Sequence, residues 1–193
     1  MRLVLASNNA KKLSELQVLF APLGVELVTQ GSLGIPEAEE PHHTFIENAL
    51  VKARHAAALS GLPAIADDSG LCVDALGGAP GVASAHFASV ALPDGEREAR
   101  RRVQDAANNR LLLDRLQGLA DRRARFVCTL LALRSADDPE PLVAVGRWPG
   151  EILQRAQGES GFGYDPLMFL PALCRSVADL DAATKNQHSH RAR

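Results

Sequence analysis

Residues 3–12 read Leu-Val-Leu-Ala-Ser-Asn-Asn-Ala-Lys-Lys and place a short apolar run directly before a polar loop. A continuous apolar run of this length is typical of a strand that is buried on both faces of a parallel sheet. Ser7 and Asn9 can cap a helix, and from Ala10 to Phe20 the apolar residues recur at helical spacing. This order of strand, loop and helix predicts an α/β fold.

The remaining sequence continues with further strands and helices. Thr44 followed by Glu47 matches a capping box, which predicts the beginning of a second helix. Expected strands cover residues 25–28, 64–66, 126–133, 142–145 and 167–170, and expected helices cover residues 44–60 and 96–116. In the last helix we expect Val103, Leu111 and Leu112 to face inward. The strands at 126–133 and 142–145 read as a hairpin with a longer loop. Buried strands of the parallel type together with a hairpin predict a mixed sheet flanked by helices.

The composition excludes several classes of protein. The 193 residues suffice for one compact domain or two small lobes that share a core, and 46% hydrophobic with 23% charged residues is ordinary for a globular chain. A net charge of −2 gives no positive field that would attract nucleic acid. No apolar run approaches the roughly 20 residues of a membrane helix, and the apolar beginning is too short for a signal peptide.

The three cysteines indicate a reducing compartment. Cys72, Cys128 and Cys174 lie far apart in apolar stretches, so we expect buried free thiols and a cytoplasmic location. The chain has no Gly-x-Ser-x-Gly motif and no cysteine in an activated setting, so covalent catalysis is not expected.

The loop from Ser7 to Lys12 lies at a strand-to-helix junction. Free backbone N–H groups and the positive end of the helix make such a junction an anion site, and Lys11 and Lys12 add charge. The loop lacks the glycines of a P-loop. On its own it is better explained as an ordinary helix cap with surface lysines.

Two adjacent acids, Asp67 and Asp68, directly follow the expected strand at 64–66. Carboxylates at the carboxyl ends of such strands stand where open α/β sheets bind ligands. Adjacent side chains point to opposite faces, so we expect one of the two, Asp68, to enter a site as a Mg²⁺ ligand or as the base that activates water. Glu39 or Glu40 could supply a second metal carboxylate. The alternatives are an ordinary Asp-Ser-Gly turn and a solvated acidic loop.

Residues 161–166 resemble a dinucleotide fingerprint only superficially, because Pro166 occupies the sixth position. The segment offers two aromatic side chains, Phe162 and Tyr164, with a carboxylate at Asp165. Such a set suits stacking on a base, worth about 1–3 kcal/mol per base. A loop anchored by core aromatic residues is the alternative.

Two basic elements have simple explanations of their own. Lys52 could reach a phosphate from its helix, although an exposed helical lysine is the simpler interpretation. Lys185 and residues 189–191 form a basic terminus for which a disordered tail is the default expectation.

Together and in this order, the motifs resemble those of the inosine/xanthosine triphosphate pyrophosphatase family. The resemblance extends over nearly the whole chain, and the combination is specific although each motif alone is modest. The matching stretches are residues 5–12, 44–49, 66–71, 77–81, 161–166 and 189–191.

The resemblance implies a single domain of two lobes over residues 1–193, with a long mixed sheet flanked by helices and a central active-site cleft. It implies a cytoplasmic, Mg²⁺-dependent homodimer that acts on nucleotides, without nucleic-acid or membrane partners. Its reaction would convert ITP, dITP and XTP to the monophosphate and pyrophosphate, which cleanses the nucleotide pool.

The resemblance also implies roles for individual residues. Asp68 would be the catalytic residue and a metal ligand, with Glu40 or its neighbour Glu39 as the second metal carboxylate. The substrate-binding residues would be Ser7, Asn8, Asn9, Ala10, Lys11, Lys12, Lys52, Ser69, Phe162, Gly163, Tyr164, Asp165, Lys185, His190 and Arg191.

The chain departs from the family pattern near its last residues. It ends at Arg193, where the family normally continues into a terminal helix. His188 replaces a usually apolar residue, and Ala192 replaces a usual glycine. We therefore expect the phosphate end of the site to follow the family more closely than the base end.

Two other functions are compatible with parts of the pattern. A Maf-like nucleotide pyrophosphatase also pairs an early polar and basic loop with acids at a strand end, but residues 162–165 and 189–191 fit it poorly. A nucleotide-sensing module without catalysis is the second alternative, against which the presence of both Asp68 and Glu40 argues.

Overall fold

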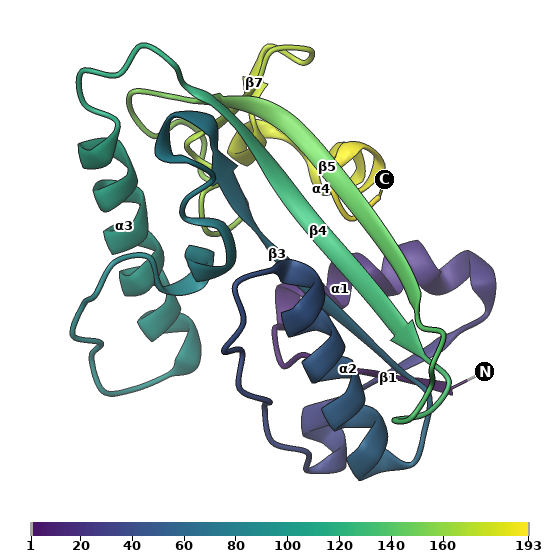
Figure 1. Ribbon diagram of the computed structural model, residues 1–193. Coiled ribbons are helices and arrows are strands. Elements are labelled where there is room, and N and C mark those ends of the chain that lie inside the picture. Colours follow the sequence, from purple (N-terminus) through teal and green to yellow (C-terminus); the bar gives the residue numbers. More distant parts are fainter. Residues whose placement is uncertain (1, 193) are drawn as a thin grey trace. The chain divides into compact units, whose positions relative to one another are not determined.

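The computed structural model describes residues 2–192, apart from the side chain of Lys11. Within this part, seven strands form one sheet in the order β2-β1-β3-β4-β5-β6-β7 (Figure 1). The strands are β1 (Arg2–Leu5), β2 (Glu26–Thr29), β3 (Ala64–Val73), β4 (Arg123–Leu133), β5 (Leu142–Ile152), β6 (Met168–Leu170) and β7 (Arg175–Ser176). The α-helices are α1 (Ala10–Phe20), α2 (Phe45–Ser60), α3 (Arg97–Arg115) and α4 (Ala182–His188).

The sheet is mixed, as the sequence predicts. β1 pairs in parallel with both β2 and β3, whereas β6 pairs antiparallel with β5 and β7. β4 and β5 are neighbours in the sheet and are joined by residues 134–141, at the position of the predicted hairpin. The α/β class with a mixed sheet is therefore confirmed.

The chain divides into two compact units. Unit 1 comprises Met1–Ser69, Cys128–Arg147 and His188–Arg193, and unit 2 comprises Gly70–Val127 and Trp148–Gln187. Each unit has its own buried core and is described by itself.

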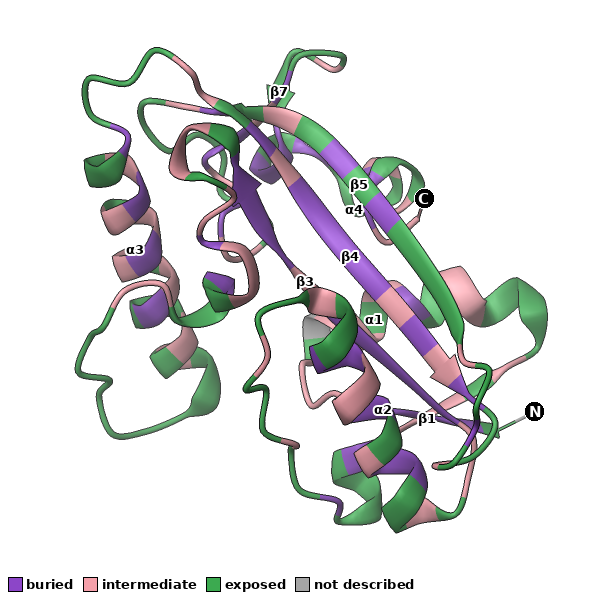
Figure 2. Ribbon diagram, in the orientation of Figure 1, coloured by how far each residue is buried: buried purple, intermediate pink, exposed green. Residues whose placement is uncertain are grey.

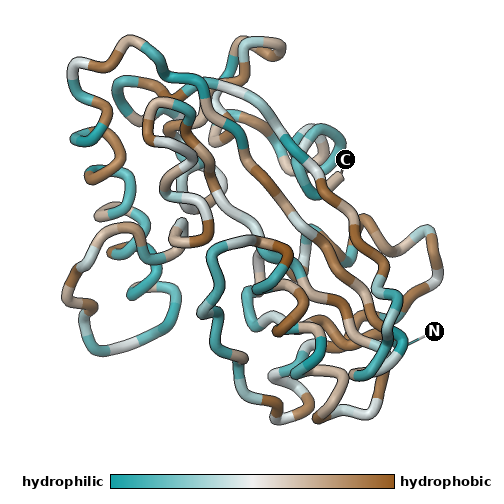
Figure 3. The backbone as a smooth tube through the Cα atoms, in the orientation of Figure 1, coloured by the Kyte–Doolittle hydropathy of each residue, from teal (hydrophilic) through white to brown (hydrophobic). Residues whose placement is uncertain are grey.

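In unit 1, two helices cover opposite faces of the sheet. Ala49, Ala53 and Ala56 of α2 are fully buried in a cluster that includes Val4 and Ala64. The other face carries Leu3, Leu5 and Ile65, which pack with Leu16 of α1 in a second cluster. Successive residues of a strand point to opposite faces, so β1 and β3 contribute alternate residues to the two clusters. Figure 2 shows the burial of these strands, and Figure 3 shows their hydrophobic character beside the hydrophilic loop that precedes α2.

In unit 2, the core gathers large side chains, among them Trp148, Phe126 and Met168. α3 buries Leu112 against this core, as predicted, whereas Val103 remains 38% exposed, contrary to the prediction. The α3 positions that are buried beside Leu112 are the polar Gln104 and Asn108. They are stable there because their side chains hydrogen-bond to backbone groups of residues 84–88.

The structure corrects the expected end of β3. The strand continues past Ala66 through both acids to Val73, and nine of its ten residues are buried. Asp, Ser and Gly have low strand propensity, which explains the early end that the sequence predicts. Pairing within the sheet outweighs this local preference.

The cysteines follow the prediction in part. Cys72 and Cys128 are buried and free, and burial raises the pKa of the Cys128 thiol to about 11. Cys174 is free but exposed, contrary to the prediction, because it lies in the turn that joins β6 to β7. None of the helices in the described part of the chain has the length and hydrophobicity that crossing a membrane requires.

The Thr44 cap at the beginning of α2 gives a test of the fold. Its side-chain oxygen accepts a hydrogen bond from the Glu47 N–H group at 3.3 Å. We expect Thr44→Ala to lower the free energy of unfolding by about 1 kcal/mol, because an N–H group at the helix end loses its partner. Urea denaturation measures the change. Thr44→Ser keeps the hydroxyl oxygen and should retain most of the stability; an equal loss in both variants would contradict the capping role.

Candidate active site

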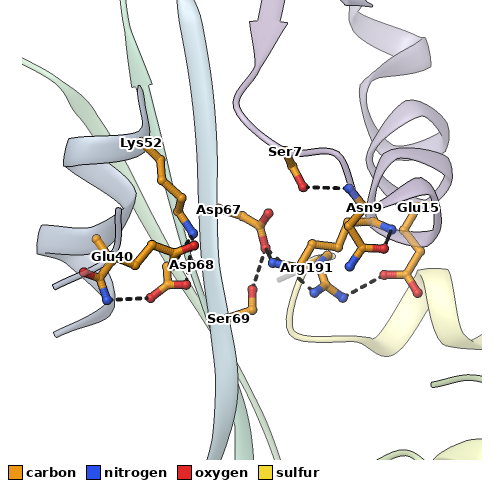
Figure 4. Close-up of polar contacts among 11 residues, drawn as sticks. Ser7, Asn9, Glu15, Glu40, Lys52, Asp67, Asp68, Ser69 and Arg191 are labelled. Carbon is orange, nitrogen blue, oxygen red and sulfur yellow. Dashed lines mark hydrogen bonds and ion pairs between the residues drawn. The ribbon is translucent and has the colours of Figure 1, made fainter. Parts of the chain in front are cut away.

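The alternation of β3 separates the two adjacent acids. Asp67 continues the face of Ile65, which packs toward α1, and Asp68 continues the face of Ala64 and Ala66, which packs toward α2. Figure 4 shows the two carboxylates on opposite sides of the strand, each with its own polar partners. The prediction that the two side chains face opposite ways is therefore confirmed, although the strand does not end there.

On the α2 side, a lysine joins two carboxylates. The Lys52 ammonium group lies 3.1 Å from Asp68 Oδ1 and 2.9 Å from Glu40 Oε2. The Asn48 side-chain N–H group donates to Asp68 Oδ2 at 3.5 Å. Lys52 and Asn48 are four residues apart and so share one face of the helix. Lys52 is 9% exposed, which rules out the interpretation as an exposed helical lysine.

Burial and neighbouring charges shift the pKa values of Asp68 and Lys52. Burial raises the pKa of Asp68 to about 6, with Glu40 adding to the rise and Lys52 opposing it. Burial by itself would lower the pKa of the Lys52 ammonium group, but the neighbouring carboxylates outweigh burial and raise the pKa. The site therefore combines a fixed cation with a carboxyl group that can exchange a proton near neutral pH.

On the α1 side, Asp67 is the common partner of several groups. Its Oδ2 atom lies 2.8 Å from the Lys12 ammonium group, accepts a hydrogen bond from the Ser69 hydroxyl at 2.7 Å, and lies 3.8 Å from Arg191 Nη2. The Asp67 side chain is fully buried. Burial by itself would raise the pKa of this carboxyl group, but the charges of Lys12, Arg191 and Lys52 outweigh burial and hold the pKa well below its usual range.

The loop before α1 is a helix cap, as the sequence allows. The Asn9 side-chain oxygen accepts from the Lys12 N–H group at 3.3 Å, and the Ser7 hydroxyl accepts from the Asn9 N–H group at 3.2 Å. Asn8 donates to Glu37 at 3.1 Å, and Ala10 is the exposed first residue of α1. The predicted contribution of the Lys11 side chain lies outside the described residues.

The last residues of unit 1 are packed against the site. Ser189 and His190 are buried, and Arg191 has a side chain that is 3% exposed. The Arg191 guanidinium group lies 2.7 Å from Glu15 Oε2 of α1, in addition to its contact with Asp67. The default expectation of a disordered tail is therefore wrong, because a buried cation requires these acidic partners.

In unit 2, Asp165 organises the aromatic loop. Its Oδ2 atom accepts from the Phe162 N–H group at 2.9 Å and lies 2.9 Å from the Lys185 ammonium group. That ammonium group also lies 4.5 Å from the centre of the Phe162 ring. Tyr164 is buried, and its hydroxyl donates to the Ser84 carbonyl oxygen at 2.9 Å. Of the predicted aromatic pair, Phe162 is half-buried, whereas Tyr164 belongs to the core.

The groups around Asp68 include oxygen donors that suit a metal ion. Among the described residues, no group of three or more His, Cys, Asp or Glu side chains could hold a metal ion. Asp68 and Glu40 are nevertheless two carboxylates that meet at one ammonium group, and Mg²⁺ commonly takes one or two carboxylates with water and phosphate oxygens. Glu39 and Glu40 are both exposed, but Glu40 contacts the Lys52 ammonium group beside Asp68, so Glu40 is the better candidate of the two. The residues present fit Mg²⁺.

Similarity to known proteins identifies the family of the chain. The model of the Ham1 family matches residues 3–193. The chain belongs to the Ham1 family. This membership confirms the resemblance seen in the motifs and favours it over the Maf-like alternative.

Similar proteins and solved structures match the chain over almost its full length. The dITP/XTP pyrophosphatase of Methylibium petroleiphilum is 76% identical over 192 residues, which cover 100% of this chain and 92% of that protein. The structure of a HAM1 protein from Coxiella burnetii has a TM-score of 0.87 and 41% identity, covering 99% of this chain and 92% of that one. A nucleoside-triphosphatase / dITP/XTP pyrophosphatase from Mycobacterium abscessus has a TM-score of 0.75 and 39% identity, covering 100% of this chain and 95% of that one.

Two residues of the site were not among the predicted site residues. The sequence places Asn48 four residues before Lys52 on one side of the helix, but its contact with Asp68 was not predicted. Glu15 has no local signal, because its partner Arg191 is 176 positions away.

The burial of Asp67 gives a second test. We expect Asp67→Asn to lower the free energy of unfolding by about 3–5 kcal/mol, because the change leaves buried cations without their counter-charge. Urea denaturation at neutral pH measures the loss. Asp121→Asn removes an exposed ion pair to Arg123 and should have little effect. Equal stability of Asp67→Asn and the wild type would contradict the role of Asp67 as an ionised anchor.

Proposed function

We propose that the protein hydrolyses non-standard purine nucleoside triphosphates, with ITP, dITP and XTP as substrates, to the monophosphate and pyrophosphate. The single observation that carries the proposal is the pair of carboxylates, Asp68 and Glu40, that meet at the Lys52 ammonium group. The names of Ham1 relatives as dITP/XTP pyrophosphatases support the same reaction. Such an enzyme removes unwanted nucleotides from the pool.

Mg²⁺ is the proposed cofactor, held by Asp68 and Glu40. When bound, it supplies positive charge that offsets the developing charge of a leaving pyrophosphate group. This role suits the site because both candidate ligands are hard oxygen donors.

Asp68 is the proposed catalytic residue. Its carboxylate can orient a water molecule and accept its proton while the water oxygen attacks the α-phosphorus. The Asn48 amide and the Lys52 ammonium group hold the carboxylate in place. Lys52 also presents a cation to the phosphates.

The residues of unit 1 near the beginning of α1 supply further groups that could bind the triphosphate. Lys12 adds a second cation, and the N–H groups at the beginning of α1 add donors. Ser69 and the loop residues Ser7 to Ala10 complete the proposed contacts.

Unit 2 carries groups that suit a purine base. Phe162 offers a ring for stacking, and Lys185 offers a cationic donor beside it. His190 and Arg191 are the proposed donors toward the 6-carbonyl of hypoxanthine or xanthine. Adenine presents an amino donor at this position, which a donor cannot accept.

A homodimer in the cytoplasm is the proposed state of the enzyme. Leu142, Val143 and Val145 of β5 are exposed apolar side chains, which suits a contact with a second copy. The three free cysteines suit a reducing compartment. Sedimentation velocity at micromolar concentration measures the mass, and a monomer would contradict the dimer.

Pyrophosphate release tests the function and the role of Asp68 together. We expect Mg²⁺-dependent turnover of ITP and XTP, weak turnover of ATP and GTP, and none with a chelator. Asp68→Asn should lower kcat by about 10²–10⁴-fold, because the amide cannot accept the proton of water. Asp121→Asn, an exposed change, should leave kcat unchanged. Binding of ITP without turnover by the wild type would instead indicate a nucleotide-sensing module.

A matched pair of variants tests the metal ligands. Glu40→Gln removes a charge beside Asp68, so the Mg²⁺ concentration for half-maximal activity should rise at least about tenfold. Glu39→Gln removes the same charge from an exposed neighbour and should leave the Mg²⁺ dependence unchanged. The opposite order of effects would assign the metal to Glu39.

A further inference from the structure

Three side chains of α3, each four residues from the next, contact the loop that carries Phe162. The Asp105 carboxylate accepts from the Gly163 N–H group at 2.9 Å, and the Asn109 amide donates to the Gly163 carbonyl oxygen at 3.0 Å. The Arg101 guanidinium carbon lies 5.2 Å from the centre of the Phe162 ring. We call Arg101, Asp105 and Asn109 the α3 stripe. Residues at this spacing lie on one face of a helix.

The α3 stripe fixes the backbone of Gly163 by hydrogen bonds. Gly163 has a φ of 61°, a left-handed conformation that other residues rarely adopt. Both of its backbone polar groups are bonded to α3, and the preceding N–H group, of Phe162, is bonded to Asp165. The backbone on each side of the Phe162 ring is therefore fixed by a charged or amide side chain.

The helix that bears the stripe is itself anchored. Gln104 and Asn108, one position away along the helix, hydrogen-bond to backbone groups of residues 84–88. Tyr164, next to Gly163, donates to the carbonyl oxygen of Ser84 in the same segment. α3 is thus a rigid support for the loop, because the hydrogen bonds of Gln104 and Asn108 fix the position of the helix against residues 84–88.

We infer that Asp105 and Asn109 are positioning residues for the Phe162 ring in purine recognition, with Arg101 holding the ring by a cation–π contact. The inference rests on the proposed function, because it concerns the ring on which the base would stack. A stacked base needs a ring at a fixed height and tilt. Asp105 and Asn109 hydrogen-bond to the Gly163 peptide, so each acts on the ring through that peptide.

The kinetic consequence is specific. The ring contacts the base in the same way before and during the reaction, so its displacement weakens ground-state and transition-state binding equally. KM should rise while kcat stays nearly constant. Binding of pyrophosphate should not change, because the proposed phosphate contacts belong to unit 1.

The experiment measures the Kd of inosine monophosphate by calorimetry, kcat and KM for ITP, and inhibition by pyrophosphate. We expect Asp105→Ala and Asn109→Ala each to raise the Kd and KM by about three- to tenfold, the effect of one lost hydrogen bond. Asp105→Asn retains an oxygen that can accept from Gly163 and should restore most of the affinity. Asp114→Asn and Arg102→Ala, exposed changes on the same helix, are the matched controls.

Two results would overturn the inference. Variants of the α3 stripe that bind inosine monophosphate as well as the controls would show that the ring needs no support from α3. A parallel loss of kcat and of pyrophosphate inhibition would show a general structural role. Arg101→Ala removes one of the two cations near the ring and leaves Lys185 in place, and with Arg101→Lys as its rescue it provides the same test if Asp105→Ala does not fold. A wild-type protein that neither binds inosine monophosphate nor hydrolyses ITP would overturn the proposed function itself.

Discussion

The site depends on two adjacent carboxylates, Asp67 and Asp68, that lie on the buried strand β3. Each of these buried negative charges requires a positively charged partner. Because β3 alternates, Asp67 and Asp68 cannot share a single partner set, and the fold supplies one on each face. Lys52 meets Asp68 from α2, and Lys12 meets Asp67 from α1. An uncompensated carboxylate in this strand would cost several kcal/mol, so the positions of both helices and of Arg191 are tied to the two acids.

Local patterns made much of this arrangement predictable. The strand, cap and helix of residues 3–20 and the Thr44 cap of α2 follow from side chains within one turn of the boundary they set. The opposite orientation of Asp67 and Asp68 follows from strand geometry alone. The extent of β3 could not be predicted, because its polar residues favour a turn locally and are held in the sheet by neighbouring strands.

Contacts between distant segments account for the rest. Lys52 looks like a surface lysine in the sequence, and its burial follows from the approach of the acidic loop and β3 to α2. Glu15 and Arg191 are 176 positions apart in the sequence and are brought together by the fold of unit 1. In unit 2, Tyr164 becomes a core residue because Ser84, 80 positions away, accepts its hydroxyl hydrogen bond. No local pattern marks these pairs.

The fully buried alanines of α2 have a geometric consequence for the chemistry. Where α2 packs on the sheet, its fully buried side chains are the methyl groups of Ala49, Ala53 and Ala56. The small size of these side chains sets how closely α2 approaches the sheet, and therefore sets the distance between Lys52 and Asp68. A larger side chain at one of these positions would push α2 away from the sheet and lengthen the contact between Lys52 and Asp68. Uncharged residues in the core therefore control an ion pair of the candidate active site.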